Sequence, residues 1–592
     1  PPPPPPPSTS SYEHDFDDPV DTRTVQGRMR ARAQPAMPPA CPSDFEGRHA
    51  VDELTAEACM LGHLRMLPRV PHHLETQWAR AMADGFDAVV AAHRLVKAAA
   101  PEAATGLDRA LKWQLVLPQL LLRMPPRGGQ RGGSMVDRRF ALYAEGKWRE
   151  LVRLLVLDLG GTGKQRQRRK GDAQTKEQAV TRAIELIRRG NISKARVLLE
   201  GSGMGDVSDP RIQAQLRAKN PQTRVDWDPS LDFGDAPRMS VDVRETWRVA
   251  DPDSGVGPDG VPSTYYSVLA RRQFLDTAAS SAVPAANRFA QLVLNDELPP
   301  WYYLLYTATV QHAPIKEEPP PNSISVPDVR PVLAGNMLRR LVTRAARAKY
   351  GDVVREECEP VQLAAGTKGV GQKLAVGSQL TAELFPDHVF VVLDWKNAFN
   401  CVHRSRVVHV IRSTPSVRVW LRAYNSHTAP MSPIYYRGDK GLVKNDYASV
   451  TGGQQGDLMG SDGYCLATLE DNRWLDAELG KHGGSYRAGM DDGVLHGPAE
   501  VVWDLVEQYI ARVELSCGLS VNRSKSKCWS PNGRYGARPA DFPIGELTRR
   551  VRDADGAERE EVAGRGVVLW GSPMGDSGFV RQVLAEQTEK KK

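Results

Sequence analysis

Two apolar, strand-like runs that end in acidic residues constrain the fold of this chain most. The first run, residues 391–393 (VVL), leads into Asp394, and the second leads into Asp491–Asp492, a pair flanked by Gly489 and Gly493. Short apolar runs bounded by turn residues indicate buried β-strands, and the glycines favour a hairpin turn. Carboxylates at the ends of neighbouring strands can share divalent metal ions. The two runs therefore predict a metal-assisted site for phosphoryl or nucleotidyl transfer.

Length and composition are those of a large protein with folded cores. The chain has 592 residues, of which 41% are hydrophobic, and its formal net charge of +7 is compatible with a polyanionic partner. The most apolar stretch, residues 113–124, is too short and too polar to span a bilayer, so we expect no membrane partner. The 7 cysteines are scattered, which argues against a disulfide framework and predicts an intracellular, reducing location.

Residue patterns divide the chain into regions of different character. We expect a disordered Pro-rich leader over 1–58, a helical extension over 59–225, a mixed region over 226–385, alternating strands and helices over 386–580, and a frayed end over 581–592. In the helical extension, Leu74, Trp78, Ala81 and Met82 share one helix face. The basic run 164–170 is typical of a solvated linker, and an RNA-contacting arm is the alternative.

Each acidic motif, taken alone, also has an ordinary structural interpretation. An Asp that follows a strand, such as Asp394, usually caps a helix or closes a turn. A pair such as Asp491–Asp492 is usually solvated, because adjacent carboxylates repel each other. The glycine-rich segment 451–457 between them allows close backbone approach to a base pair or sugar, or is a simple loop. The order and spacing of these motifs with others distinguish the two interpretations.

Further motifs accompany the acidic ones in order along residues 255–580. Residues 394–400 (DWKNAFN), 453–457 (GQQGD) and 489–492 (GMDD) resemble motifs A, B and C in the palm of reverse transcriptases, in particular those of non-LTR (LINE-type) retrotransposons. The remaining segments resemble the two fingers motifs, motif D and the hairpin that follows it. They are residues 257–260, 329–341, 518–525 and 569–575.

This resemblance implies an α+β fold of the right-hand polymerase type. The fingers would occupy 226–385, and the palm, an antiparallel sheet with packed helices, would occupy 386–580 after a helical N-terminal region. Few residues follow 580, so we expect the helical thumb to be largely missing, with its start in 581–592.

The same resemblance implies an RNA-directed DNA polymerase that transfers a nucleotide from a dNTP to a primer 3′-hydroxyl. Asp394 and Asp491 would be the principal ligands of two Mg²⁺ ions, for which Mn²⁺ could substitute, and Asp492 would be the supporting carboxylate. Lys525 would act as general acid near the pyrophosphate, with a simple surface lysine as the alternative.

The nucleotide-binding residues follow from the matching positions. Phe399 matches the family's steric gate, whose ring crowds a ribose 2′-hydroxyl, and the backbone carbonyl of Trp395 would complete a metal shell. Arg330 would pair with triphosphate oxygens, and Gln455 and Gly456 would line the templating base pair. Lys316 is the expected partner of Arg330, although an acidic, proline-rich loop follows it in place of the usual short one.

Two other functions stay open at this point. An RNA-dependent RNA polymerase would share the fold and the acids, but Phe399 argues against it. An inactive or domesticated fragment would bind RNA or DNA without extending a primer. The expected partners of the enzyme are an RNA template, a DNA primer and a dNTP. Priming at a chromosomal target would require nuclear access, with which the basic run 164–170 agrees.

Overall fold

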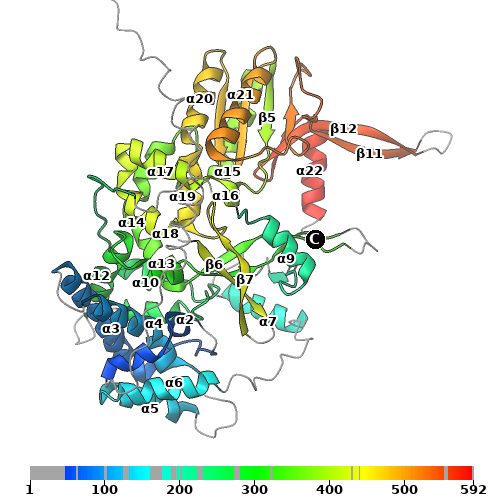
Figure 1. Cartoon of the computed structure of the whole chain (residues 1–592). Coiled ribbons are helices and arrows are strands. Elements are labelled where there is room, and N and C mark those ends of the chain that lie inside the picture. The colour runs from blue at the N-terminus through cyan, green and yellow to red at the C-terminus, as the bar shows by residue number, and fades with distance from the viewer. Residues whose placement is uncertain are drawn as a thin grey trace, which may run out of the picture.

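Helices and small sheets pack around one main hydrophobic core in this α+β protein (Figure 1). In Figure 1 the N-terminal helices lie at one end of the molecule, and the strands of the acidic motifs lie at the other. The computed structural model describes residues 47–61, 64–98, 103–124, 132–160, 176–188, 195, 198–199, 203–222, 231–271, 281–319, 325–428, 431–438, 441–552 and 558–589. The basic run 164–170 lies outside the described residues.

The N-terminal region is helical. Its elements are η2 (Gly47–Glu53), α2 (Ala56–Met60), η3 (His72–Leu74), α3 (Glu75–Lys97), α4 (Ala103–Leu122), α5 (Gly132–Ala144), α6 (Trp148–Gly160), α7 (Lys176–Arg188) and α9 (Pro210–Ala218). The helix face predicted from Leu74, Trp78, Ala81 and Met82 is confirmed, because all four side chains are buried. The indole N–H of Trp78 also donates to the carbonyl of Tyr265 at 2.9 Å, which joins α3 to the following region.

The leader that was expected over 1–58 ends earlier than predicted. Ala50, Val51, Leu54 and Ala56 are buried, and η2 and α2 pack against α4. The Thr55 side chain caps α2 by accepting from the backbone of Ala58 at 3.0 Å. This short apolar segment follows a Pro-rich composition closely, so composition alone placed the boundary too late. Residues 1–46 lie outside the described part.

The next region combines helices with the first sheet. Its helices are α10 (Arg244–Arg248), α11 (Thr264–Leu269), α12 (Ala282–Leu294), α13 (Pro300–Tyr306), α14 (Met337–Cys358) and α15 (Val370–Leu384). The first sheet has the order β4-β1-β6-β7 and is formed by β1 (Thr309–His312), β4 (Val332–Gly335), β6 (Ser432–Gly438) and β7 (Gly441–Ser449). Strand β1 pairs antiparallel with β4 and parallel with β6. This sheet joins strands from both sides of the boundary predicted at 385/386. Local sequence patterns do not show which distant strands pair, so they could not predict this.

The second sheet carries the acidic motifs. It has the order β10-β5-β9-β8, is antiparallel throughout, and is formed by β5 (His388–Leu393), β8 (Ser485–Gly489), β9 (Asp492–Pro498) and β10 (Lys527–Trp529). Helices α20 and α21 pack against β8 and β9, respectively. The helices of this region are α16 (Ala398–Cys401), α17 (Arg404–Ser413), η7 (Pro415–Trp420), α18 (Leu421–Thr428), α19 (Leu458–Ala467), α20 (Leu469–Gly480) and α21 (Val502–Cys517).

The C-terminal region forms a third sheet and a final helix. Strands β11 (Glu546–Arg552), β12 (Glu558–Leu569) and β13 (Ser572–Gly575) make antiparallel pairs, and the β11–β12 hairpin projects from the body (Figure 1). Helix α22 (Ser577–Glu589) packs on β12 and β13, with Phe579 and Val583 buried. The expectation of a frayed end is therefore wrong for 581–589. A small sheet pairs β2 (Ile315–Glu317) with β3 (Asp328–Val329).

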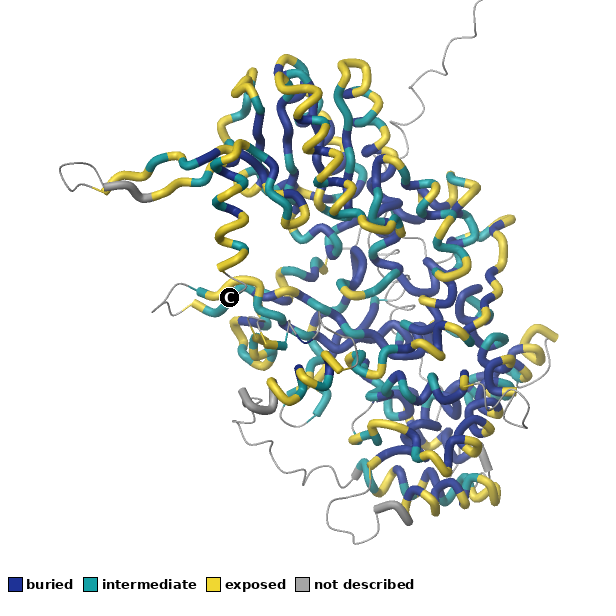
Figure 2. Tube along the Cα trace, turned by 180° about the vertical axis from the view of Figure 1, so that it is seen from behind, coloured by how far each residue is buried: buried dark blue, intermediate teal, exposed yellow. Residues whose placement is uncertain are grey.

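Burial follows this architecture. Figure 2 shows the trace buried through the helices and sheets of the body, and exposed along much of the projecting hairpin. Every helix in the described ranges is too short or too polar to cross a lipid bilayer.

Replacing Trp78 tests how strongly the N-terminal helices support the body. Trp78→Ala removes a fully buried ring that packs edge-on against Tyr265, with 5.5 Å between ring centroids, and it also removes the hydrogen bond to the Tyr265 carbonyl. We expect a loss of about 3–5 kcal/mol in the free energy of unfolding, measured by urea denaturation. Leu95→Ala on the exposed side of the same helix should change stability by less than about 0.5 kcal/mol. Equal effects of the two changes would contradict this role.

Candidate active site

Strand pairing brings the predicted carboxylates to one edge of the second sheet. Leu393 at the end of β5 pairs with Gly493 near the start of β9, so Asp394 follows directly at the point where the β8–β9 hairpin turns. Gly489 pairs with Asp492, which leaves Met490 and Asp491 as the turn of that hairpin. Asp394 and the acidic pair, almost a hundred residues apart in the chain, thus meet at the same strand ends.

The charges around Asp491 show which other predicted residues reach this edge. Burial raises the pKa of Asp491 above the usual value for a carboxyl group, and the charge of Asp394 raises it further. The charges of Arg330 and Lys316 act on the pKa of Asp491 in the opposite direction. The other predicted metal ligand and two predicted phosphate-binding residues therefore lie within electrostatic reach of Asp491.

Asp492 belongs to the same group of charges. Partial burial raises its pKa to about 6, and the charges of Asp491 and Asp394 contribute to that increase. The charges of Asp394 and Asp491 thus disfavour the ionised form of a neighbouring carboxyl group, and a cation at this edge would be stabilising.

The donor set fits a magnesium ion that arrives with a phosphate ligand. Among the described residues, no group of three or more His, Cys, Asp or Glu side chains could hold a metal ion by itself. Mg²⁺ is usually held by one or two protein carboxylates, with waters and substrate phosphates completing its six oxygen ligands. Asp394 and Asp491 supply two such carboxylates, and the nearby cationic residues Arg330 and Lys316 suit a triphosphate.

The turn before Asp491 is fixed by a residue that the sequence patterns did not reveal. Met490 has a φ of 61°, an unfavourable region for a residue with a side chain. The side-chain amide of Gln362 spans its backbone: Gln362 Nε2 donates to the Met490 carbonyl at 3.0 Å, and Gln362 Oε1 accepts from the Met490 N–H at 2.8 Å. The backbone N–H of Leu363 also donates to the carbonyl of Ala488 at 2.8 Å. The segment 361–363 therefore locks the acidic turn from outside the hairpin.

The C-terminal sheet packs onto the same turn. A Cβ atom on Gly489 would collide with the ring of Trp570, which directly follows β12. Trp570 itself has a φ of 51°, so the loop that carries it is also held in an unusual conformation. Only glycine at 489 allows this close approach.

The backbone of Asp394 is anchored by the loop that contains Lys525. The N–H of Asp394 donates to Ser526 Oγ at 3.0 Å, and its carbonyl accepts from the N–H of Asn522 at 2.6 Å. The side chain of Lys525 is exposed in this loop, close in sequence to both anchors. The Trp395 ring is buried edge-on against Tyr509, with 6.0 Å between ring centroids, so Trp395 can offer a ligand only its backbone.

Phe399 lies under the glycine-rich segment. Its ring is half-buried against Tyr464, with 5.2 Å between centroids, and its carbonyl accepts from the N–H of Gly453 at 2.6 Å. Gly452 has a φ of 63°, and a Cβ atom there would collide with the backbone of Phe399 and Asn400. Glycine at position 452 is thus required by its close contact with residues 399–400.

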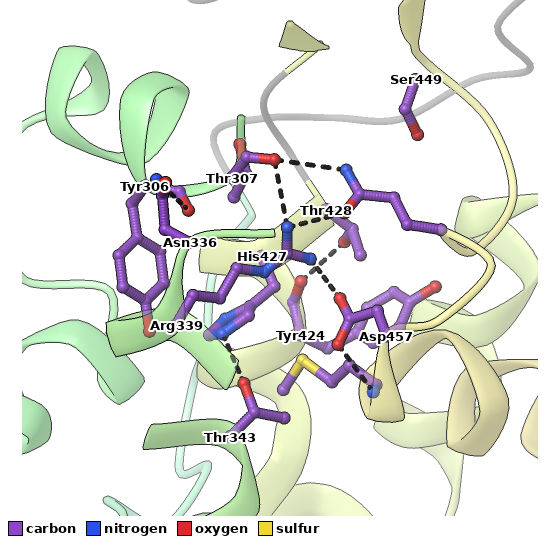
Figure 3. Close-up of polar contacts among 12 residues, drawn as sticks. Tyr306, Thr307, Asn336, Arg339, Thr343, Tyr424, His427, Thr428, Ser449 and Asp457 are labelled. Carbon is purple, nitrogen blue, oxygen red and sulfur yellow. Dashed lines mark hydrogen bonds and ion pairs between the residues drawn. The ribbon is translucent and has the colours of Figure 1, made fainter. Parts of the chain in front are cut away.

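A buried arginine sets the position of Gln455 and Gly456. Arg339 on α14 donates to the Thr307 carbonyl at 3.1 Å and to Gln454 Oε1 at 2.7 Å, and it forms an ion pair with Asp457 (Figure 3). Asp457 also caps α19 by accepting from the Met459 N–H at 3.2 Å. Arg339 therefore holds the residues on both sides of the Gln455–Gly456 pair.

Gln455 and Gly456 complete the set of predicted residues. The Gln455 carbonyl accepts from the N–H of Leu333 at 3.0 Å, and Gln455 Oε1 is buried without a hydrogen-bond partner among the described residues. Gly456 is exposed with a φ of 109°. A buried acceptor with no partner is costly, so Gln455 is suited to receive a hydrogen bond from a ligand.

His427 lies against this arginine and stays neutral. Its Nδ1 is 2.8 Å from the Ala423 carbonyl and its Nε2 is 3.1 Å from Thr343 Oγ1, which fits a tautomer with the proton on Nδ1 (Figure 3). Burial lowers the pKa of His427 to about 4, and the charge of Arg339 contributes to that decrease.

This neutral histidine predicts a pH dependence of stability. The unfolded chain binds a proton at the ordinary histidine pKa of 6.5, whereas the folded chain does so only near 4. The stability is therefore present above pH 6.5 and is lost as the pH falls towards 4, by an amount on the order of 3 kcal/mol. We expect His427→Asn, whose amide can replace ring Nδ1, to remove this part of the pH dependence in urea denaturation from pH 4 to pH 7. Parallel curves for the two proteins would rule out His427 as the source.

Neither a scan against protein-family models nor a search of curated proteins finds a match for the chain. The order of the motifs and the geometry of the strand-end carboxylates are thus the grounds on which a function can be inferred.

Proposed function

We propose that this chain is a reverse transcriptase of the non-LTR retrotransposon type, an RNA-directed DNA polymerase. The observation that carries the proposal is the meeting of Asp394 with Asp491 at one sheet edge, where the charges of Arg330 and Lys316 act on Asp491. A site for nucleotidyl transfer needs carboxylates for metal ions and cations for the triphosphate in this proximity.

In this proposal the second sheet is the palm of a right-hand polymerase. Strands β5, β9 and β8 would carry motifs A and C, and helices α20 and α21 would support them. Strand β2, which contains Lys316, and strand β3, which directly precedes Arg330, would belong to the fingers. The partners would be an RNA template, a DNA primer and a dNTP, and priming at a chromosomal target would place the protein in the nucleus.

The chemical step would be attack of the primer 3′-oxygen on the α-phosphorus of the dNTP. The bond from that phosphorus to the bridging oxygen breaks, and pyrophosphate leaves. Two Mg²⁺ ions, where bound, lower the pKa of the 3′-hydroxyl and offset the charge on the leaving group. Asp394 and Asp491 would hold them, with Asp492 in support.

The cationic residues would act on the triphosphate. Arg330 is exposed and can form bidentate hydrogen bonds with its oxygens, and Lys316 would add a second charge. Lys525 would donate a proton to the pyrophosphate from the loop that anchors Asp394. Gln455, whose buried Oε1 has no partner among the described residues, would accept a hydrogen bond from the templating base pair or the incoming nucleotide.

Removing either principal carboxylate tests the proposed chemistry. We expect Asp394→Asn and Asp491→Asn to reduce primer extension on an RNA template in Mg²⁺ by a factor of about a thousand or more, because each removes a metal ligand. The matched control is Asp504→Asn, an exposed acid at the start of α21, beyond the opposite end of β9. The control should extend primers at the wild-type rate.

The outcomes of this experiment separate the alternative functions. Extension that survives both substitutions would exclude the two-metal mechanism. A wild-type protein that binds primer–template in a salt-dependent way and never extends it would be a binding protein instead. Extension with rNTPs in preference to dNTPs would identify an RNA polymerase.

Phe399 provides a separate test of sugar selection. Phe399→Ala removes the ring that would crowd a ribose 2′-hydroxyl, so we expect rNTP incorporation relative to dNTP to rise by about tenfold to a hundredfold. The measurement is kcat/KM for single-nucleotide addition of each substrate. Phe385→Ala, at the opposite end of β5, should leave the ratio unchanged. An unchanged ratio in Phe399→Ala would remove this residue from the proposed site.

A further inference from the structure

A segment far upstream in the chain contacts the turn that carries Phe399. Residues 219–222 follow α9, and they lie against the residues after β5 although about 180 positions separate them in sequence. Asn397 Nδ2 donates to the Lys219 carbonyl at 2.6 Å, and Asn400 Nδ2 donates to Asn220 Oδ1 at 3.1 Å. These two bonds flank Phe399 on both sides in sequence.

Both ends of this contact are buried. Asn220 is 3% exposed and Asn400 is 4% exposed, so water cannot readily replace either partner. Asn397 has a φ of 48°, so the turn holds a conformation that a non-glycine residue rarely adopts unless its surroundings impose it. Gly452 and Gly453 contact the backbone at Phe399 and Asn400, as described above, so the turn is held between two segments.

The upstream segment is itself anchored and can act as a rigid support. Asn220 Nδ2 donates to the Leu216 carbonyl at 2.8 Å, and Leu216 is buried in a small core with Val329 and Ile434. The Gln222 side chain pairs with the backbone of Ala448, donating to its carbonyl at 2.9 Å and accepting from its N–H at 3.2 Å.

The same segment also reaches the strand before Arg330. The Lys219 side chain forms an ion pair with Asp328 and donates to the Val329 carbonyl. Residues 219–220 therefore connect the backbone that presents a proposed triphosphate-binding residue to the turn that presents the proposed steric gate.

We propose that Asn220 is a positioning residue for sugar selection, acting through Asn400 on the placement of Phe399. The inference rests on the proposed polymerase function. Loss of Asn220 leaves the buried amide of Asn400 without its acceptor, so the turn shifts to satisfy it. A steric gate discriminates through close contact, so a displacement of about 1 Å is enough to admit a 2′-hydroxyl.

The effect falls on selection more than on metal binding. Asp394 is anchored independently by Ser526 and Asn522, on the other side of Trp395 from the turn. Its carboxylate therefore keeps its place when the contact between Asn220 and Asn400 is lost.

The test compares Asn220→Ala with Arg217→Ala. Arg217 lies on the last turn of α9 and forms an exposed ion pair with Asp446, so its removal perturbs the same helix without touching the turn. We expect Asn220→Ala to lower the dNTP-to-rNTP ratio of kcat/KM by about threefold to tenfold, the worth of one buried hydrogen bond. Arg217→Ala should keep the wild-type ratio. A wild-type ratio in Asn220→Ala overturns the proposal.

A double-substitution cycle separates positioning from general destabilisation. Asn400→Ala should reproduce the loss of selection, and adding Asn220→Ala to it should lower the ratio little further, because the two residues form one contact. Independent, multiplying effects of the two substitutions would contradict action through Asn400.

Hydrogen exchange tests the contact without relying on catalysis. In Asn220→Ala, the amides of residues 397–403 and 452–453 should exchange faster than in wild type and in Arg217→Ala. A wild-type protein that never extends a primer would overturn the polymerase function. The exchange rates in Asn220→Ala would still show whether Asn220 holds the turn in place. Unchanged exchange at these amides would show that Asn220 does not position the turn.

Discussion

The register between β5 and β9 is the constraint on which the rest of the site depends. Because side chains alternate along a strand, a slip of one residue between Leu393 and Gly493 would turn every side chain of one strand to the opposite face and separate Asp394 from Asp491. The neighbouring structure holds this register from several directions. Gln362 and Trp570 fix the hairpin turn, and the loop with Asn522 fixes the backbone of Asp394. Each of these contacts keeps mutually repelling carboxylates at one edge.

Buried arginines hold the loops of the site in place through hydrogen bonds. Arg339 joins α14 to the residues around Gln455, and Arg404 donates to the carbonyls of Gly452 and Thr428 at 2.8 and 2.6 Å. Burial lowers the pKa of Arg404 to about 10, because a charged guanidinium is less stable away from water. A nonpolar side chain could fill the same space, but it could not satisfy several backbone carbonyls that have no regular strand or helix partner.

Local patterns in the sequence predicted the features that arise from neighbouring residues. The strands before Asp394 and around Asp491 and the buried helix face with Trp78 follow from periodicity and turn residues, whereas the antiparallel sheet was expected from the family resemblance alone. Long-range partners were missed. Nothing near Gln362 shows that its amide spans Met490, 128 residues away, and nothing near Asn220 shows its contact with Asn400. A polar side chain gives no periodic signal, and its partner is decided by tertiary packing.

The mixed pairing of β1 imposes an order on the folding of this protein during its synthesis. Thr309 pairs with Gly335 in β4, which is made soon afterwards, but its parallel neighbour Ile434 in β6 emerges much later. While the ribosome makes the intervening residues, β1 keeps one edge of unpaired N–H and C=O groups, which attracts other strands. Parallel pairing across so long a loop is also slow to form. The helices before residue 300 can fold during this interval, whereas the sheet that contacts Gln455 through Leu333 waits for the later half of the chain. A chaperone that shields an open strand edge would act at this stage.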